Sequence, residues 1–122
     1  MRSTQAEKDA VGRYGEKVAV AHLEEAGMRV LARNWRCRHG EVDVVALDGD
    51  TLVVCEVKTR RSSGQGSPFE AVTPRKAARL RRLASAWLEL HPMLPETVRI
   101  DVVGVVVPSR GPAHVERVTG VC

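Results

Sequence analysis

The sequence of 122 residues suits one compact domain, and its 43% hydrophobic content predicts a packed core rather than a disordered chain. No run approaches the roughly 20 apolar residues of a membrane-spanning helix, so a membrane protein of that kind is excluded. The first residues lack the apolar stretch of a secretory signal, and we therefore expect a cytoplasmic protein.

Positive charge is concentrated in the middle of the chain. The whole sequence carries 19 basic and 15 acidic residues, whereas residues 29–82 carry 12 basic and 6 acidic ones. An excess of this kind is expected in a protein that meets phosphates, although a solvated surface rich in arginine would produce it too. Nucleic acid is therefore a candidate partner.

We expect the chain to begin with a helix over residues 5–26. Thr4 is a typical N-cap, and Gly27 provides a natural stop. Gly12 and Gly15 lie inside this helix, where each costs up to roughly 1 kcal/mol relative to alanine. Glycines at such positions usually mark close packing against another element, so a helix laid on a sheet is expected.

Strands and a second helix are expected in the rest of the chain. The expected strands are residues 28–35, 41–47, 51–58 and 98–107, with His114–Val118 as an edge strand, and the expected helix begins at Thr73-Pro74 and ends near residue 91. A loop over residues 59–68 is expected before that helix. The nearly continuous apolar run at 98–107 is typical of a strand covered on both faces.

This order, α-β-β-β-α-β with an optional last strand, predicts one α/β domain over residues 1–122, a sandwich with a mixed central sheet flanked by helices. Its core is expected over residues 5–107, and residues 108–122 are expected to add a terminal hairpin or edge strand. The valine-rich final strands would leave an edge that could pair with a second copy, so a homodimer is left open.

Three ionisable residues fall within the hairpin expected at the centre of the chain. Side chains alternate along a strand, so Glu56 and Lys58 are expected on one face. With a two-residue loop at 49–50, Asp43 pairs with Glu56, and with the loop at 48–49 it lies diagonal to Glu56. Either register gathers two carboxylates and one ammonium. A three-residue loop without a bulge would send Asp43 to the other face.

Charged groups inside a strand need a chemical reason. Asp43 and Glu56 would repel each other unless a cation lay between them, and their hard oxygen ligands suit Mg²⁺, for which Mn²⁺ would substitute. Lys58 could then orient the attacking water or neutralise charge on a phosphate. These residues would form a site for metal-assisted hydrolysis of a phosphodiester. The alternative is a structural salt bridge among the same three side chains on a partly exposed face.

The second helix adds a cluster of positive charge. Five of its residues are basic, and residues 75, 79 and 82 share one face by helical spacing. The candidate nucleic-acid-binding residues are Arg60, Arg61, Arg75, Lys76, Arg79 and Arg82. No base-reading motif appears, so recognition of backbone charge or shape is expected, with a strong dependence on salt. The alternative is a solvated helix face.

The layout Asp43-x12-Glu56-x-Lys58 resembles the D…(D/E)-x-K core of the restriction-endonuclease-like nuclease superfamily, PD-(D/E)XK. A closer resemblance, to the YraN family, is carried by GRYGEKVA at 12–19, NWR at 34–36, GEVD at 40–43, EVKTR at 56–60, EAV at 70–72 and DVV at 101–103. It covers roughly residues 11–107. The superfamily's proline before the aspartate is replaced here by Val42.

The resemblance implies a restriction-endonuclease-like sandwich, similar in fold to archaeal Holliday-junction resolvases, in a family regarded as predicted endonucleases. It implies that Asp43 and Glu56 are metal ligands and that Lys58 is the catalytic lysine. It also implies that Glu16 is the additional acidic residue that completes the site.

The expected function is therefore a Mg²⁺-dependent endonuclease acting on DNA, including branched or otherwise structured DNA. One alternative is a nucleic-acid-binding module that keeps the nuclease fold and cuts nothing. A protein-interacting adaptor, which would have no affinity for DNA at any salt concentration, is a further alternative.

Overall fold

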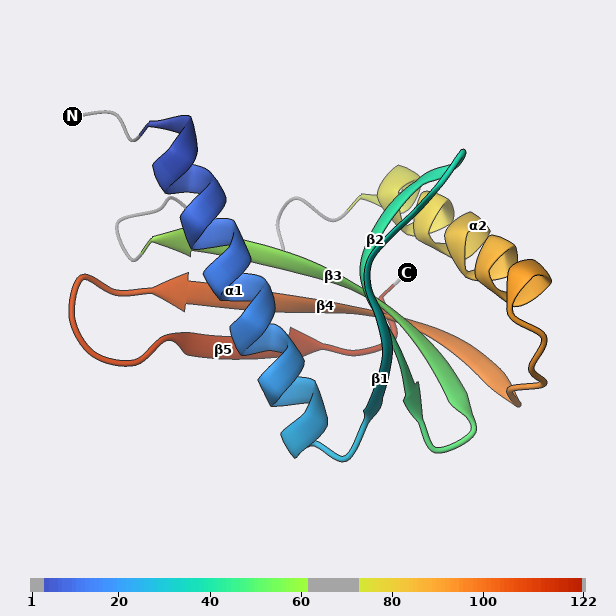
Figure 1. Cartoon of the computed structure of the whole chain (residues 1–122). Helices are drawn as coiled ribbons and strands as arrows, with labels where there is room; N and C mark the ends of the chain where they lie inside the picture. The colour runs from blue at the N-terminus through green and yellow to red at the C-terminus, as the bar shows by residue number, and fades with distance from the viewer. Residues whose placement is uncertain (1–3, 62–72, 122) are drawn as a thin grey trace.

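The computed structural model describes residues 4–61 and 73–121 as a helix-and-sheet fold (Figure 1). The elements in chain order are α1 (Gln5–Glu25), β1 (Arg29–Cys37), β2 (Gly40–Asp48), β3 (Thr51–Arg61), α2 (Pro74–Leu90), β4 (Thr97–Val107) and β5 (His114–Val118). This confirms the order of helices and strands expected from the sequence. Both N-caps are confirmed as well, because the Thr4 and Thr73 hydroxyls accept hydrogen bonds from the backbone N–H groups of Glu7 and Lys76.

The five strands form one mixed sheet in the order β1-β2-β3-β4-β5. Neighbouring strands are antiparallel except for β3 and β4, which are parallel and are joined through the segment that contains α2. A parallel pair requires such a crossover, because its second strand must start from the same end of the sheet as the first.

The two helices cover opposite faces of this sheet. Val53 and Val54 are neighbours on β3, yet Val53 packs in a buried cluster with Leu23 of α1, and Val54 packs in a second cluster with Leu80 and Leu83 of α2. In Figure 1, α1 crosses one face, whereas α2 lies beside the curled β1–β2 hairpin. The central strands are therefore covered on both sides, and two acidic residues within them, Glu56 and Asp101, are buried.

One expected boundary is wrong. Residues 59–61, assigned from the sequence to a loop, continue β3, because β4 pairs with it along its whole length, from Thr51↔Thr97 to Arg61↔Val107. The pairing that holds these polar residues in a strand comes from a segment far along the chain. The remainder of the expected loop, up to residue 68, lies outside the described residues.

The β1–β2 hairpin turns away from β3 at one level of the sheet. Val42 and Val45 both pack in the cluster under α2, although Val44 between them packs under α1, so the alternation of side chains is interrupted at Asp43. Across the hairpin, Asn34 adopts a left-handed conformation, with φ of 52°. Figure 1 shows this hairpin curling out of the sheet, which leaves a fork between β2 and β3.

Among the described helices, neither combines the length and the apolar character needed to cross a membrane.

Candidate active site

Asp43 stands at the point where β2 and β3 separate. The pairing of these strands runs from Asp48↔Thr51 to Val44↔Cys55, which selects the register with the two-residue loop at 49–50. One residue further on, the Asp43 Oδ2 atom accepts a hydrogen bond of 2.7 Å from the backbone N–H of Val57. The carboxylate therefore takes the place of a ladder hydrogen bond and is fixed between the two strands.

Glu56 lies on β3 beside this position, with its side chain only 11% exposed. Its Oε1 atom is 3.8 Å from the Nζ atom of Lys58, which confirms that the two side chains share a face. Its Oε2 atom is buried and has no hydrogen-bond partner within the described part of the chain. A buried carboxylate oxygen without a donor carries an uncompensated desolvation cost, so this atom has free capacity for a ligand.

The other buried acidic residue of the described chain provides a contrast. Asp101 on β4 is fully buried, and both of its carboxylate oxygens are bonded: Arg99 donates to each of them, Arg117 donates to one, and the backbone N–H of Gly120 donates to the other. Such a carboxylate is saturated by its own fold. Among the described residues, Glu56 has two cations near its Oε1 atom and accepts no hydrogen bond, and its Oε2 atom has no partner.

Negative charge acts on Asp43 from several sides. The pKa of Asp43 is raised to about 6, first by burial and then by repulsion from Glu16, Glu56 and Glu41, against the opposing effect of the Val57 N–H bond. Three other carboxylates thus repel Asp43 at this point. Among the ion pairs of the described residues none joins Asp43 to a cation, so a continuous salt bridge through all three residues does not form.

Glu16 reaches this region because α1 lies directly on β3. A Cβ atom added to Gly15 would meet the Thr59 side chain, with Oγ1 at 1.9 Å and Cβ at 2.7 Å, so only glycine permits this approach. The expectation of close packing is correct for Gly15. It is wrong for Gly12, where an added Cβ meets nothing within 4 Å because that position faces open space.

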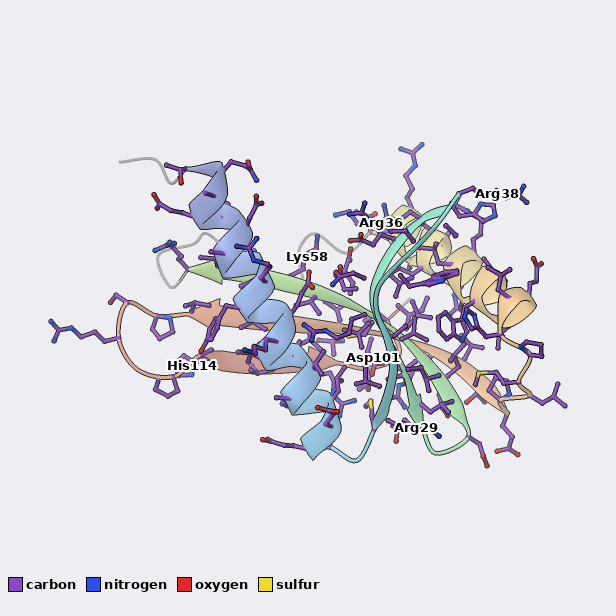
Figure 2. All side chains as sticks on the ribbon, viewed as in Figure 1. Arg29, Arg36, Arg38, Lys58, Asp101 and His114 are labelled. Atoms are coloured by element: carbon purple, nitrogen blue, oxygen red, sulfur yellow. The ribbon has the colours of Figure 1, made fainter. Side chains whose placement is uncertain are left out.

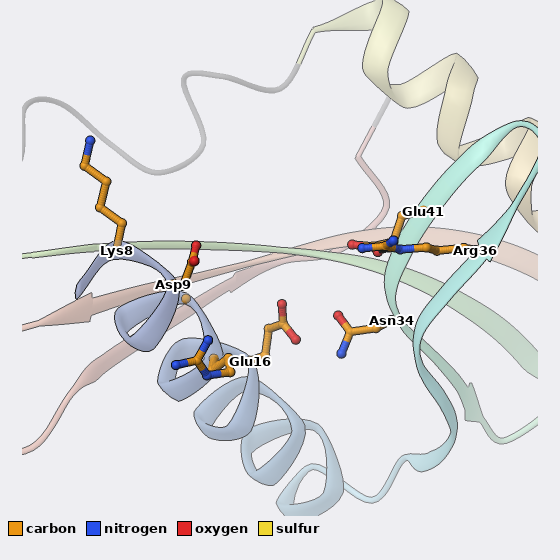
Figure 3. Close-up of a pocket in the computed structure, with 8 residues that line it drawn as sticks. Lys8, Asp9, Glu16, Asn34, Arg36 and Glu41 are labelled. Carbon is orange, nitrogen blue, oxygen red and sulfur yellow. Dashed lines mark hydrogen bonds and ion pairs between the residues drawn. The ribbon is translucent and has the colours of Figure 1, made fainter. Parts of the chain in front are cut away.

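A hollow of about 310 Å³ separates the start of α1 from the β1–β2 hairpin. Its lining residues are Lys8, Asp9, Gly12, Arg13, Glu16, Asn34, Arg36 and Glu41. Figure 3 shows Glu16 and Asn34 pointing toward each other across it, while Arg36 and Glu41 form an ion pair at its rim. Figure 2 shows Lys58 on β3 in the region between α1 and this hairpin.

The donor atoms present fit a hard divalent cation. Within residues 4–61 and 73–121, no three His, Cys, Asp or Glu side chains are grouped as a metal-binding set. Mg²⁺ does not require one, because it usually retains several waters and is bound through one or two carboxylates plus substrate phosphates. Asp43 and the unpartnered oxygen of Glu56 could supply two ligands of this kind, and Glu16 adds negative charge that acts on Asp43.

The candidate basic residues lie in different surroundings. Arg79 is half-buried on α2, with an NH2 atom 3.7 Å from the Glu56 Oε1 atom, whereas Arg75 and Arg82 are exposed on the same helix. The remaining candidates are Lys76, which is half-buried on α2, and Arg60 and Arg61 at the end of β3. Of the candidates on α2, the ion pair of Arg79 brings it to the carboxylates.

Comparison with known sequences places the chain in a family. The sequence pattern of the uncharacterised protein family UPF0102 matches residues 15–105. The chain belongs to this family. A UPF0102 protein of Kineococcus radiotolerans is 68% identical over 115 residues, covering 93% of this chain and 94% of the relative. Another from Streptomyces griseus subsp. griseus is 59% identical over 115 residues, covering 93% and 97%.

Three features of the UPF0102 site were missed by sequence reasoning. They are the hydrogen bond from Val57 to Asp43, the left-handed Asn34 and the ion pair of Arg79 with Glu56. Only Asn34 had a local signal, since asparagine tolerates the left-handed region better than most residues. The other two join residues from different elements, and no local pattern predicts them.

Proposed function

We propose that this UPF0102 chain is a metal-dependent endonuclease that hydrolyses phosphodiester bonds in DNA, with the restriction-endonuclease-like arrangement that the YraN resemblance implies. The single observation that carries the proposal is the Glu56 carboxylate. It is buried beside Lys58 and near enough to Asp43 to repel it, and one of its oxygens has no partner among the described residues. A carboxylate that served only to hold the sheet together would be saturated, as Asp101 is.

Asp43 and Glu56 would hold the cation, and Mg²⁺ bound there would polarise the phosphate and lower the pKa of a bound water. The Val57 N–H keeps Asp43 facing the fork. The Lys58 side chain is one-third exposed and lies beside the Glu56 carboxylate, so its ammonium could extend to an incoming phosphate or orient the attacking water.

The basic residues indicate which class of substrate the protein would bind. Arg75 and Arg82 are exposed on α2, and Arg60 and Arg61 end β3 two and three residues after Lys58. A phosphate backbone attracted by these side chains would be led toward the carboxylates. The resemblance to Holliday-junction resolvases adds branched DNA to the substrates that should be tested.

The first test is cleavage of labelled duplex, single-stranded, flap and four-way-junction DNA in Mn²⁺ by the wild type and by Glu56→Gln. We expect the wild type to cut at least one substrate and the variant to be slower by at least about 100-fold, because a cation ligand is lost without a change in shape.

Asp50→Asn is the matched control, since it removes an exposed carboxylate from the β2–β3 loop, outside the fork. It should cut like the wild type. Equal cleavage by Glu56→Gln and the wild type would contradict the assignment.

A second function, a nucleic-acid-binding module without catalysis, is favoured by one observation. Glu56 has Lys58 and Arg79 within 4 Å, so part of its charge is compensated without a metal ion. Titration with Mn²⁺ separates the two proposals. DNA binding with neither heat nor thermal stabilisation on adding Mn²⁺ would support the binding module.

A further inference from the structure

We propose that Arg79 has two alternative partners: the Glu56 carboxylate in the free protein and a phosphate group of the nucleic acid in the complex. This inference rests on the proposed endonuclease function, and it separates Arg79 from the other basic residues of α2. It would make Arg79 a substrate-binding residue at the point of cleavage.

The buried face of α2 fixes the position of Arg79 next to the site. Leu80 and Leu83 pack in the cluster between α2 and the sheet, and Arg79 precedes them on the edge of this buried surface. Its side chain is 41% exposed, so it bridges the covered carboxylate and the solvent. A backbone fixed in this way leaves the guanidinium free to turn between two partners without moving the helix.

The contact of Arg79 with Glu56 is incomplete on both sides. The NH2 atom is 3.7 Å from Oε1, which is an ion pair but too long for a hydrogen bond. Within residues 4–61 and 73–121, the buried Nε atom of Arg79 has no acceptor and the Oε2 atom of Glu56 has no donor. The Nε and NH2 groups of an arginine form the edge that binds carboxylate or phosphate through two parallel hydrogen bonds. Here that edge is close to an anion but makes neither bond.

An incomplete pair exchanges readily because little is lost when it opens. A phosphate lying over the fork offers oxygens to both Nε and NH2, so Arg79 gains hydrogen bonds that Glu56 does not provide. When Arg79 turns away, the positive charge that competes with a divalent cation for Glu56 leaves with it. Binding of nucleic acid and binding of the cation should therefore support each other.

This exchange predicts opposite effects on two measurements. In Arg79→Gln, Mn²⁺ should bind roughly threefold to tenfold more tightly in the absence of DNA, since a competing positive charge near Glu56 is gone. The same variant should have a kcat about 100-fold lower and a higher KM, because a donor to the phosphate is lost both in the complex and during the reaction. A residue that merely stabilised the fold would lower both metal affinity and rate.

The experiment uses the full chain and compares wild type, Arg79→Gln, Arg79→Lys and Arg82→Gln. Mn²⁺ affinity is measured by calorimetry without DNA, and kcat and KM are measured on the best DNA substrate. Lysine keeps the charge and loses the planar edge, so Arg79→Lys should bind Mn²⁺ like the wild type and still lose at least about tenfold in kcat. Arg82→Gln, from the exposed side of α2, should change KM alone.

Two results would overturn the proposal while leaving the nuclease function intact. In the first result, the wild type cuts DNA, and Arg79→Gln either changes KM alone, as Arg82→Gln does, or has the same kcat and KM as the wild type. The other is weaker Mn²⁺ binding by Arg79→Gln in a variant whose thermal unfolding matches the wild type. A wild type that neither binds Mn²⁺ nor cuts any substrate would overturn the nuclease function and the phosphate partner of Arg79 together.

Discussion

Asp43 combines two roles that oppose each other in the metal-free protein. Its carboxylate accepts a hydrogen bond from the Val57 N–H at the end of the β2–β3 ladder, and this bond stabilises the folded state. Its charge lies partly buried among other carboxylates, which raises its pKa from 3.8 to about 6. The folded protein therefore binds this proton more tightly than the unfolded chain does. The contribution of Asp43 to stability is greatest below about pH 4 and is lost as the pH rises through 6.

We predict that Asp43→Asn is more stable than the wild type at pH 7.5 in EDTA, by on the order of 2 kcal/mol. The amide oxygen can still accept the Val57 N–H, while the repelled charge is gone. Near pH 4 the wild-type carboxyl is protonated, so the two proteins should be equally stable. Urea unfolding at the two pH values measures the difference.

Asp50→Asn serves as the control because its carboxylate is exposed in the hairpin loop. Its free energy of unfolding should equal that of the wild type at both pH values. An Asp43→Asn variant that is less stable than the wild type at pH 7.5 would show that the carboxylate is compensated in the free protein.

The packing of α1 on β3 depends on one of its two glycines. At Gly15 an added methyl group would overlap the Cβ atom of Thr59, which cannot move without its strand, whereas at Gly12 it would meet open space. We predict that Gly15→Ala destabilises the protein by about 2 kcal/mol through overpacking. Gly12→Ala should stabilise it by up to about 1 kcal/mol through helix propensity.

Urea unfolding of the two variants side by side tests this asymmetry. The substitutions are chemically identical and lie three residues apart in one helix, so propensity alone would move both in the same direction. Equal shifts would contradict the close approach of α1 to β3.

The elements were predictable where the signal was local. The two threonine caps fixed the starts of both helices, and the loop at 49–50 was one of the two registers that the sequence allowed. The length of β3 was not predictable, because residues 59–61 are polar and their strand conformation depends on pairing with β4. The fork at Asp43 was also hidden, since it requires a break in alternation that only the packing of Val42 and Val44 on opposite faces reveals.

At the scale of the whole molecule, the proposed function brings exposed basic side chains to a phosphate backbone. We predict that affinity for duplex DNA, measured in EDTA by fluorescence anisotropy, falls about 100-fold between roughly 50 and 200 mM salt, as for a protein that neutralises about four phosphates. In Arg82→Gln the slope of log affinity against log salt should decrease by about one. An affinity that does not change with salt concentration would contradict the proposed contact of the basic side chains with phosphates.

The candidate site as a whole was predictable only in outline. Residue spacing predicted that Asp43, Glu56 and Lys58 lie together, because a hairpin converts sequence distance into spatial proximity. The contact of Glu56 with Lys58 is present, whereas the pairing of β2 with β3 ends one residue before Asp43 would face Glu56. Residue spacing could not place Arg79, whose helix reaches Glu56 only after the crossover from β3 to β4 has been completed. Sequence patterns describe neighbours within an element or a hairpin, and the partners of Glu56 from other elements depend on how the layers pack.

The fork between β2 and β3 carries a consequence for how this chain can evolve. A backbone ladder continues wherever two strands stay in register, and a valine at position 43 would let β2 follow β3 for further residues. Asp43 stops that continuation, since its side chain occupies the Val57 donor that the next backbone carbonyl would use. Selection for stability alone would favour pairing the two strands further, whereas the proposed chemistry requires that they stay apart. On the proposed function, the opening that would admit a substrate exists because Asp43 ends the β2–β3 ladder.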